Sequence, residues 1–83
     1  MNVVVLTPEQ EAFNGAAKSI KVPGTGGEFE ILNNHAPIVS SLEHGNIRIL
    51  KEDGEKVEFV INSGFVEVLN NEVSILAQGL TKE

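Results

Sequence analysis

Residues 56–77, which read KVEFVINSGFVEVLNNEVSILA, indicate the fold class most clearly. Phe59 and Ile61 stand at alternate positions, as they do in a strand whose successive side chains point to opposite faces. The turn signals Asn62-Ser63-Gly64 and Asn70-Asn71 divide the stretch into three short runs. The stretch therefore predicts consecutive short β-strands that turn back on one another.

The rest of the chain repeats this pattern of short apolar runs between turn residues. The expected strands are residues 2–6, 11–16, 18–22, 28–31, 38–42, 46–50, 57–61, 65–69 and 73–77, with 79–83 as a polar tail. About eight to ten short strands in one domain, residues 1–83, predict an all-β fold of two antiparallel sheets packed as a β-sandwich. A single sheet would leave one apolar face in water. A barrel is the less favoured alternative.

The composition excludes several classes of function. Twelve acidic against six basic residues give a formal charge of -6 without a basic cluster, which disfavours nucleic acid and anionic lipid as partners. The absence of cysteine removes disulfides and thiolate metal sites. No apolar run approaches the roughly 18 residues that span a bilayer, and the N-terminus lacks signal-peptide features. We therefore expect a cytosolic chain.

Residues suited to catalysis are sparse. His35 and His44 are the two imidazoles, and their spacing, with Glu28 and Glu43 as possible oxygen ligands, fits no known metal site. Gly24-Thr25-Gly26-Gly27 lacks the lysine of a phosphate-binding loop. We expect no catalytic residue, metal, nucleotide or other cofactor, and we expect His35 to bond the backbone of its own turn.

The C-terminal strands carry apolar side chains on both faces. One set comprises Phe59, Val66, Val68 and Ile75, and the alternating set comprises Val60, Phe65, Leu69 and Leu76. One explanation is that sheet twist and strand ends hide the second set within the fold. The other is that part of this surface docks a partner. The exposure of these side chains in the folded chain separates the two explanations.

Five short motifs stand in order along nearly the whole chain: residues 6–9 (LTPE), 22–27 (VPGTGG), 27–37 (GEFEILNNHAP), 46–49 (NIRI) and 63–77 (SGFVEVLNNEVSILA). In the same order they resemble V-T-P-E, L-P-G-x-x-G, G-E-(F/L)-G-(V/I)-(L/Y)-P-G-H-A-P, G-x-(V/I)-R-I and G-G-(F/I)-(V/L)-E-V-x-x-N-x-V-x-V-L-A. These are motifs of the ε subunit of F-type ATP synthases, which is called δ in mitochondria. Each motif is weak alone, but their collinear order is specific.

The chain departs from the family pattern at several positions. Glu30 replaces a glycine, Asn33-Asn34 replace Pro-Gly, and Ser63 replaces the first glycine of a pair. Asparagine tolerates left-handed backbone geometry, so we expect the turns to persist. Family members commonly continue into a C-terminal helical hairpin with an ATP-sensing and inhibitory role, whereas this sequence stops at Glu83. We expect a naturally short ε subunit, with a piece of a longer one as the alternative, and assign no regulatory role.

The resemblance implies a non-catalytic rotor subunit in the central stalk of a proton-translocating ATP synthase, peripheral to the cytoplasmic face of the inner (plasma) membrane. Its expected partners are the γ subunit and the c-ring, and it would couple ion flow to ATP synthesis. The c-ring contact implied by position comprises Glu28, Phe29 and Glu30. The implied γ contact comprises His35, Ala36, Pro37, Val60, Phe65, Leu69 and Leu76.

Two other functions compete with this interpretation. A small peptide- or glycan-binding sandwich would present an aromatic platform, and the chain has four Phe and no Trp or Tyr. A cupin-type enzyme would gather metal-binding histidines from several strands, and two histidines fall short of that requirement.

Overall fold

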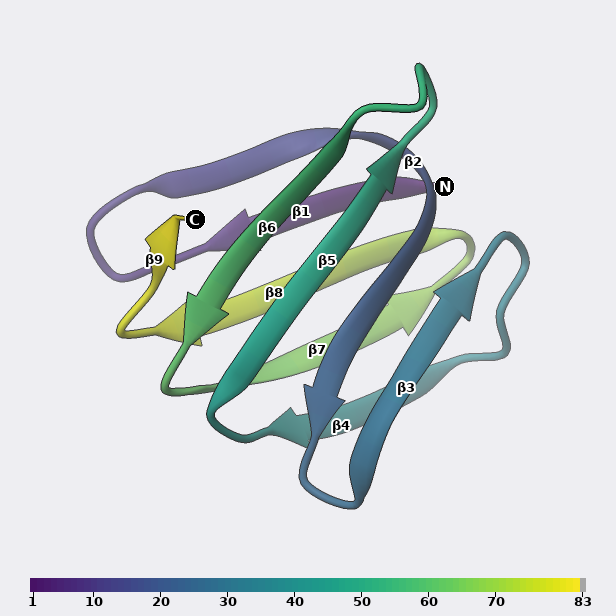
Figure 1. Ribbon diagram of the computed structural model, residues 1–83. Coiled ribbons are helices and arrows are strands. Elements are labelled where there is room, and N and C mark those ends of the chain that lie inside the picture. The colour runs from purple at the N-terminus through teal and green to yellow at the C-terminus, as the bar shows by residue number, and fades with distance from the viewer. Residues whose placement is uncertain (83) are drawn as a thin grey trace.

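The computed structural model describes residues 1–82, which form nine β-strands joined by short turns (Figure 1). The strands are β1 (Asn2–Leu6), β2 (Glu11–Gly24), β3 (Gly27–Leu32), β4 (Ile38–Leu42), β5 (Gly45–Lys51), β6 (Lys56–Ile61), β7 (Ser63–Leu69), β8 (Glu72–Gln78) and β9 (Thr81–Lys82). The all-β prediction is confirmed. Over these residues, no helix is long and apolar enough to span a membrane.

The strands lie in two layers (Figure 1). The back sheet has the order β1–β8–β7–β4, and the front sheet consists of β3, β2, β5, β6 and β9. Neighbouring strands are antiparallel except β1 and β8, which run parallel. The hydrogen-bonded ladder continues from one layer to the other because β2 also pairs with β1 and, at Gly24, with β4.

Strand β2 joins the two layers, and here two predicted strands are one. Its first part pairs with β1, and its last part, residues 19–24, pairs with β3. The register of β2 against β5 shifts between Ala17 and Ser19, which is a β-bulge of the kind that bends a strand. The prediction of separate strands over residues 11–16 and 18–22 is therefore wrong, because the bulge bends the chain without ending the ladder.

The space between the sheets is filled by aliphatic side chains at alternate strand positions. The largest fully buried side chains are Ile20, Ile31, Ile47, Ile49, Ile61 and Ile75. Burying an isoleucine stabilises a fold by about 1.5–3 kcal/mol. No polar or charged residue between positions 1 and 82 is buried. The interior therefore consists of packed apolar side chains, and any contact with a ligand or a partner must occur on the outer faces or the loops.

Asparagine residues form the turns at one end of the sandwich. Asn70 and Asn71 have φ values of 50° and 64° between β7 and β8, as both central residues of a type I′ hairpin turn require. Asn34 has a φ of 66°, so the expected left-handed geometry is present there. The Asn34 backbone N–H donates to Asn71 Oδ1 at 2.8 Å, which ties the β3–β4 loop to the β7–β8 turn.

The predicted polar tail, residues 79–83, is partly a strand. Thr81 and Lys82 form β9 and pair with Val60 and Phe59 of β6. Leu80 packs against the core. Glu83 lies outside the described residues. A strand of two residues is too short to show an alternating pattern, so β9 could not be predicted from the sequence.

Candidate functional site

The outer surface of the back sheet carries several exposed apolar side chains. The strand register places Leu6 beside Leu76 and Leu76 beside Phe65 in one row across β1, β8 and β7. Phe65 and Leu76 are each 57% exposed. Val39 on β4 is 71% exposed, and Leu69 on β7 is 51% exposed. We call these five residues the apolar face.

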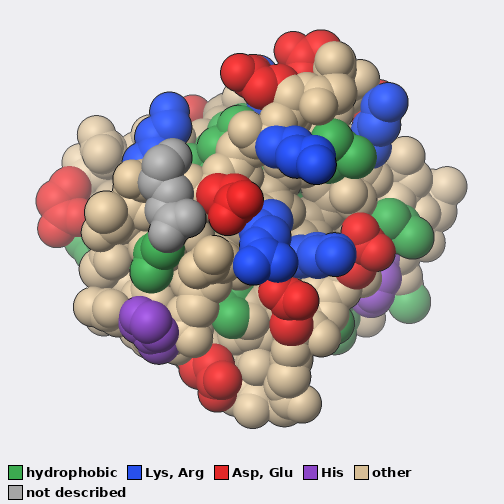
Figure 2. Space-filling model, in the orientation of Figure 1, with side chains coloured by type: hydrophobic (Ala, Val, Ile, Leu, Met, Phe, Trp, Pro, Cys, Tyr) green, Lys and Arg blue, Asp and Glu red, His purple; other side chains and the backbone are tan. Residues whose placement is uncertain are grey.

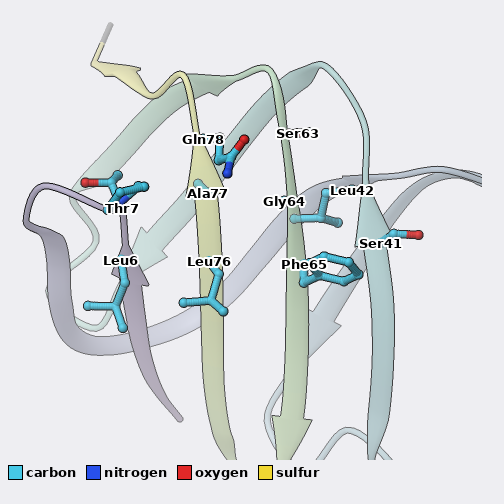
Figure 3. Close-up of a pocket in the computed structure, with 11 residues that line it drawn as sticks. Leu6, Thr7, Ser41, Leu42, Ser63, Gly64, Phe65, Leu76, Ala77 and Gln78 are labelled. Carbon is cyan, nitrogen blue, oxygen red and sulfur yellow. The ribbon is translucent and has the colours of Figure 1, made fainter.

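A shallow hollow lies at one end of the apolar face (Figure 3). Its volume is about 630 Å³, and Leu6, Leu76 and Phe65 line it together with the polar residues Ser41 and Gln78. Figure 3 shows these side chains on neighbouring strands of one sheet. A contiguous apolar surface of this kind on a small protein typically marks a site of protein contact.

Gly64 allows β7 to approach β8 closely beneath this hollow. A Cβ atom at Gly64 would lie nearer to the Leu76 carbonyl oxygen than real Cβ atoms come. A side chain at this position would push the two strands apart. The spacing of Phe65 and Leu76 on the surface therefore depends on this glycine.

The outer surface of the front sheet is charged. The register sets Glu30, Lys21, Arg48 and Glu58 side by side across β3, β2, β5 and β6. Arg48 Nη1 lies 3.9 Å from Glu28 Oε2, and Arg48 Nε lies 3.7 Å from Glu58 Oε2. Figure 2 shows Lys and Arg side chains beside Asp and Glu on this face. These ion pairs are about half exposed, and each contributes only about 0–1 kcal/mol.

The three residues implied in the c-ring contact divide between two faces of β3. Glu28 and Glu30 are exposed on the outer face. Phe29 is half-buried and packs against the core. Its ring also fills the space beside Gly24, where a Cβ would meet it. Phe29 therefore supports the β2–β3 turn from inside, and Glu28 and Glu30 are the residues that reach outward.

The segment His35-Ala36-Pro37 forms most of the β3–β4 loop. His35 Nδ1 donates to the Ala36 carbonyl oxygen at 2.6 Å, so the expected bond to its own turn is confirmed. The His35 backbone N–H donates to the Leu32 carbonyl oxygen at 3.2 Å. Ala36 and Pro37 are exposed and lead directly into β4, the strand that carries Val39. This loop therefore borders the apolar face.

Val60 does not share a surface with Phe65, Leu69 and Leu76. It points outward from β6 in the front sheet, where it is half-buried and pairs with Thr81 of β9. The grouping of Val60 with the other three is corrected accordingly. The explanation that the fold hides this set is wrong for Phe65, Leu69 and Leu76, each of which is more than half exposed.

The hairpin tip between β5 and β6 holds a small ionic cluster away from both candidate contacts. Lys51 Nζ donates to Glu55 Oε1 at 2.8 Å and lies 3.9 Å from Asp53 Oδ2. The hydrogen bond to Glu55, followed by the negative charges of Asp53 and Glu55, raises the pKa of Lys51 above its ordinary value. Among residues 1–82, no group of three or more His, Cys, Asp or Glu side chains is placed to hold a metal ion.

Two solved structures share this fold. A chain of the mitochondrial ATP synthase of Euglena gracilis, in a complex described as OSCP/F1/c-ring, superimposes with a TM-score of 0.85, covering 96% of this chain and 51% of that one at 24% identity. A chain of the Tetrahymena thermophila mitochondrial ATP synthase central stalk/c-ring gives a TM-score of 0.80 at 23% identity, covering 98% of this chain and 65% of that one.

Curated relatives match at higher identity. The ATP synthase epsilon chain of Leptospira borgpetersenii is 45% identical, covering 100% of this chain and 65% of the relative. That of Thermosynechococcus vestitus is 40% identical, covering 95% and 56%. That of Protochlamydia amoebophila is 38% identical, covering 92% and 52%. The chain thus spans about half to two thirds of the length of these relatives.

The family model described as "ATP synthase, Delta/Epsilon chain, beta-sandwich domain" matches residues 1–83. This match covers the full sequence and agrees with the two-layer arrangement of the strands. The chain therefore belongs to the family of the β-sandwich domain of the ATP synthase delta/epsilon chain.

Proposed function

We propose that this chain is a non-catalytic central-stalk subunit of an F-type ATP synthase that binds the γ subunit through the apolar face and the c-ring through the outer edge of β3. Family membership supports the assignment to the synthase. The main observation behind the γ contact is the exposed apolar face, because a permanent protein partner typically buries a large surface with an apolar core. As a rigid body between γ and the c-ring, the sandwich would help to couple ion flow to ATP synthesis.

The γ contact is proposed for the apolar face because burial of its exposed apolar side chains by a partner is favourable. Phe65 and Leu76 stand beside one another on paired strands, which fixes their positions before binding. Pre-organised apolar and aromatic side chains supply most of the affinity of a stable protein interface. The loop containing His35, Ala36 and Pro37 extends the proposed contact at the edge of the sheet.

The c-ring contact is proposed for Glu28 and Glu30, at the free edge of the front sheet. Both carboxylates are exposed, and polar or basic loops of a c-ring could pair with them. Arg48 already lies 3.9 Å from Glu28, so the net attraction from Glu28 is small. Replacing Glu28 with alanine should therefore weaken assembly only mildly, within the roughly 0–1 kcal/mol of an exposed ion pair.

Binding to isolated partners tests this function. The chain is titrated by calorimetry into purified γ subunit and, separately, into detergent-solubilised c-ring from the same source. Stoichiometric binding to γ supports the proposal, and binding to the c-ring alone would reassign the apolar face. Failure to bind either partner or the assembled synthase would refute it.

A further inference from the structure

We infer that Glu67 selects the surface that docks on the apolar face, and that this partner surface carries a lysine or arginine among apolar side chains. The inference rests on the proposed function, because it takes the γ subunit as the occupant.

Glu67 lies in the middle of the apolar face. It is exposed at the centre of β7, and the register places it beside Val39 on β4 and Ser74 on β8. Along its own strand, Phe65 and Leu69 point to the same side two residues away in each direction. Any partner that covers these apolar side chains must also cover the carboxylate.

The Lys and Arg side chains lie on other strands, and the N-terminal ammonium of Met1 bonds Asn33 Oδ1 and the Ala17 carbonyl oxygen. The six Lys and Arg residues are Lys18, Lys21, Arg48, Lys51, Lys56 and Lys82. They lie on β2, β5, β6 and β9, so β1, β4, β7 and β8 carry none. Within residues 1–82, the ion pairs involve Arg48 and Lys51 and leave Glu67 without a cation.

This placement determines what the partner must supply. On the front sheet, Glu58 has Arg48 at 3.7 Å, whereas Glu67 is exposed and forms no ion pair within residues 1–82. Covering a carboxylate without a compensating partner is strongly unfavourable. A lysine or arginine on the docking surface removes this cost and also fixes the orientation of the complex.

The same charge argues against two other occupants. A second copy would bring another net charge of -6 and its own Glu67 and Glu72 toward the same face. Like charges across an interface are unfavourable. An anionic lipid surface is repelled for the same reason. The apolar face therefore fits a basic and apolar protein surface.

Two substitutions at Glu67 test the inference against purified γ subunit. Glu67→Gln keeps the shape and removes the charge, and Glu67→Lys reverses it. Glu58→Gln is the control, because Glu58 also lies in mid-strand but on the opposite outer face, and it belongs to neither proposed contact. Affinities are measured by calorimetry in about 50 mM and about 300 mM salt, since screening weakens charge pairs. Circular dichroism verifies that each variant is folded.

We expect Glu67→Gln to bind γ at least about 10-fold more weakly at low salt and Glu67→Lys to bind more weakly still. The affinity of the unsubstituted chain should fall with salt, and that of Glu67→Gln should fall less. The affinity of Glu58→Gln for γ should stay within about two-fold of that of the unsubstituted chain. Unchanged affinity and salt dependence in Glu67→Gln, with the unsubstituted chain bound, would overturn the inference and leave the proposed function standing. No binding by the unsubstituted chain would overturn both.

Discussion

Replacing Phe65 with threonine should weaken binding to the γ subunit about 100-fold and leave the fold nearly as stable. The Phe65 side chain is 57% exposed in the folded chain. A phenylalanine offers about 200 Å² of surface, so about 110 Å² remains for a partner to bury. At about 25 cal/mol per Å², this area is worth about 3 kcal/mol, which is about 100-fold in Kd.

The assay for Phe65→Thr is calorimetric titration into purified γ subunit, with thermal unfolding measured in parallel. Threonine is a good strand residue, so the unfolding free energy should change by less than about 1 kcal/mol. Val60→Thr is the control, because Val60 points outward from the opposite sheet. Wild-type affinity in Phe65→Thr, or an equal loss in Val60→Thr, would refute the assignment of the γ contact to the apolar face.

Two further predictions concern the scaffold of this face, and a third concerns the β5–β6 hairpin tip. Gly64→Ala should destabilise the fold by about 1–3 kcal/mol in chemical denaturation, because its Cβ would meet the neighbouring backbone. Gly26→Ala is the control: open space surrounds Gly26, so the unfolding free energy should change by less than about 0.5 kcal/mol. Asn71→Gly keeps the left-handed turn but loses the bond to the β3–β4 loop, so it should cost about 1 kcal/mol and speed hydrogen exchange at the amide that this side chain binds. The raised pKa of Lys51 should return toward its ordinary value in Glu55→Gln, as followed by NMR titration. Because the pKa of Lys51 is higher in the folded state, the stability that its ion pairs contribute is fully present below the ordinary pKa of about 10.4 and is lost as pH rises through the folded-state pKa. An unchanged Lys51 titration in Glu55→Gln would exclude Glu55 as the cause of the raised pKa.

Local patterns in the sequence predicted most of the strands. The alternation at Phe59 and Ile61 placed β6, and the pair Asn70-Asn71 marked the β7–β8 turn, because both signals depend on neighbouring residues only. The bulge near Ala17 was missed for the same reason. A bulge is a property of the pairing between two strands, and sequence alternation within one of them does not reveal that the ladder continues.

The candidate surface was predictable only in part. The sequence showed that Phe65 and Leu76 belong to an apolar set outside the main core pattern, but it did not show which sheet each strand joins. Val60 was therefore grouped with them, although β6 lies in the front sheet. Leu6 and Val39 were missed because they reach the apolar face through the pairing of β1 with β8 and of β4 with β7, which are long-range contacts.

Site-specific cross-linking identifies which face of the sandwich contacts the γ subunit, since the chain contains no cysteine and a single introduced thiol is unique. Ser74 points outward from the centre of the apolar face, and Ser19 points outward from the front sheet. Ser74→Cys and Ser19→Cys are each labelled with a photoactivatable cross-linker, and each is assembled with the synthase before irradiation. We predict that the γ subunit is captured from position 74 and not from position 19. Capture of γ from position 19 alone would contradict the proposal that the apolar face binds the γ subunit.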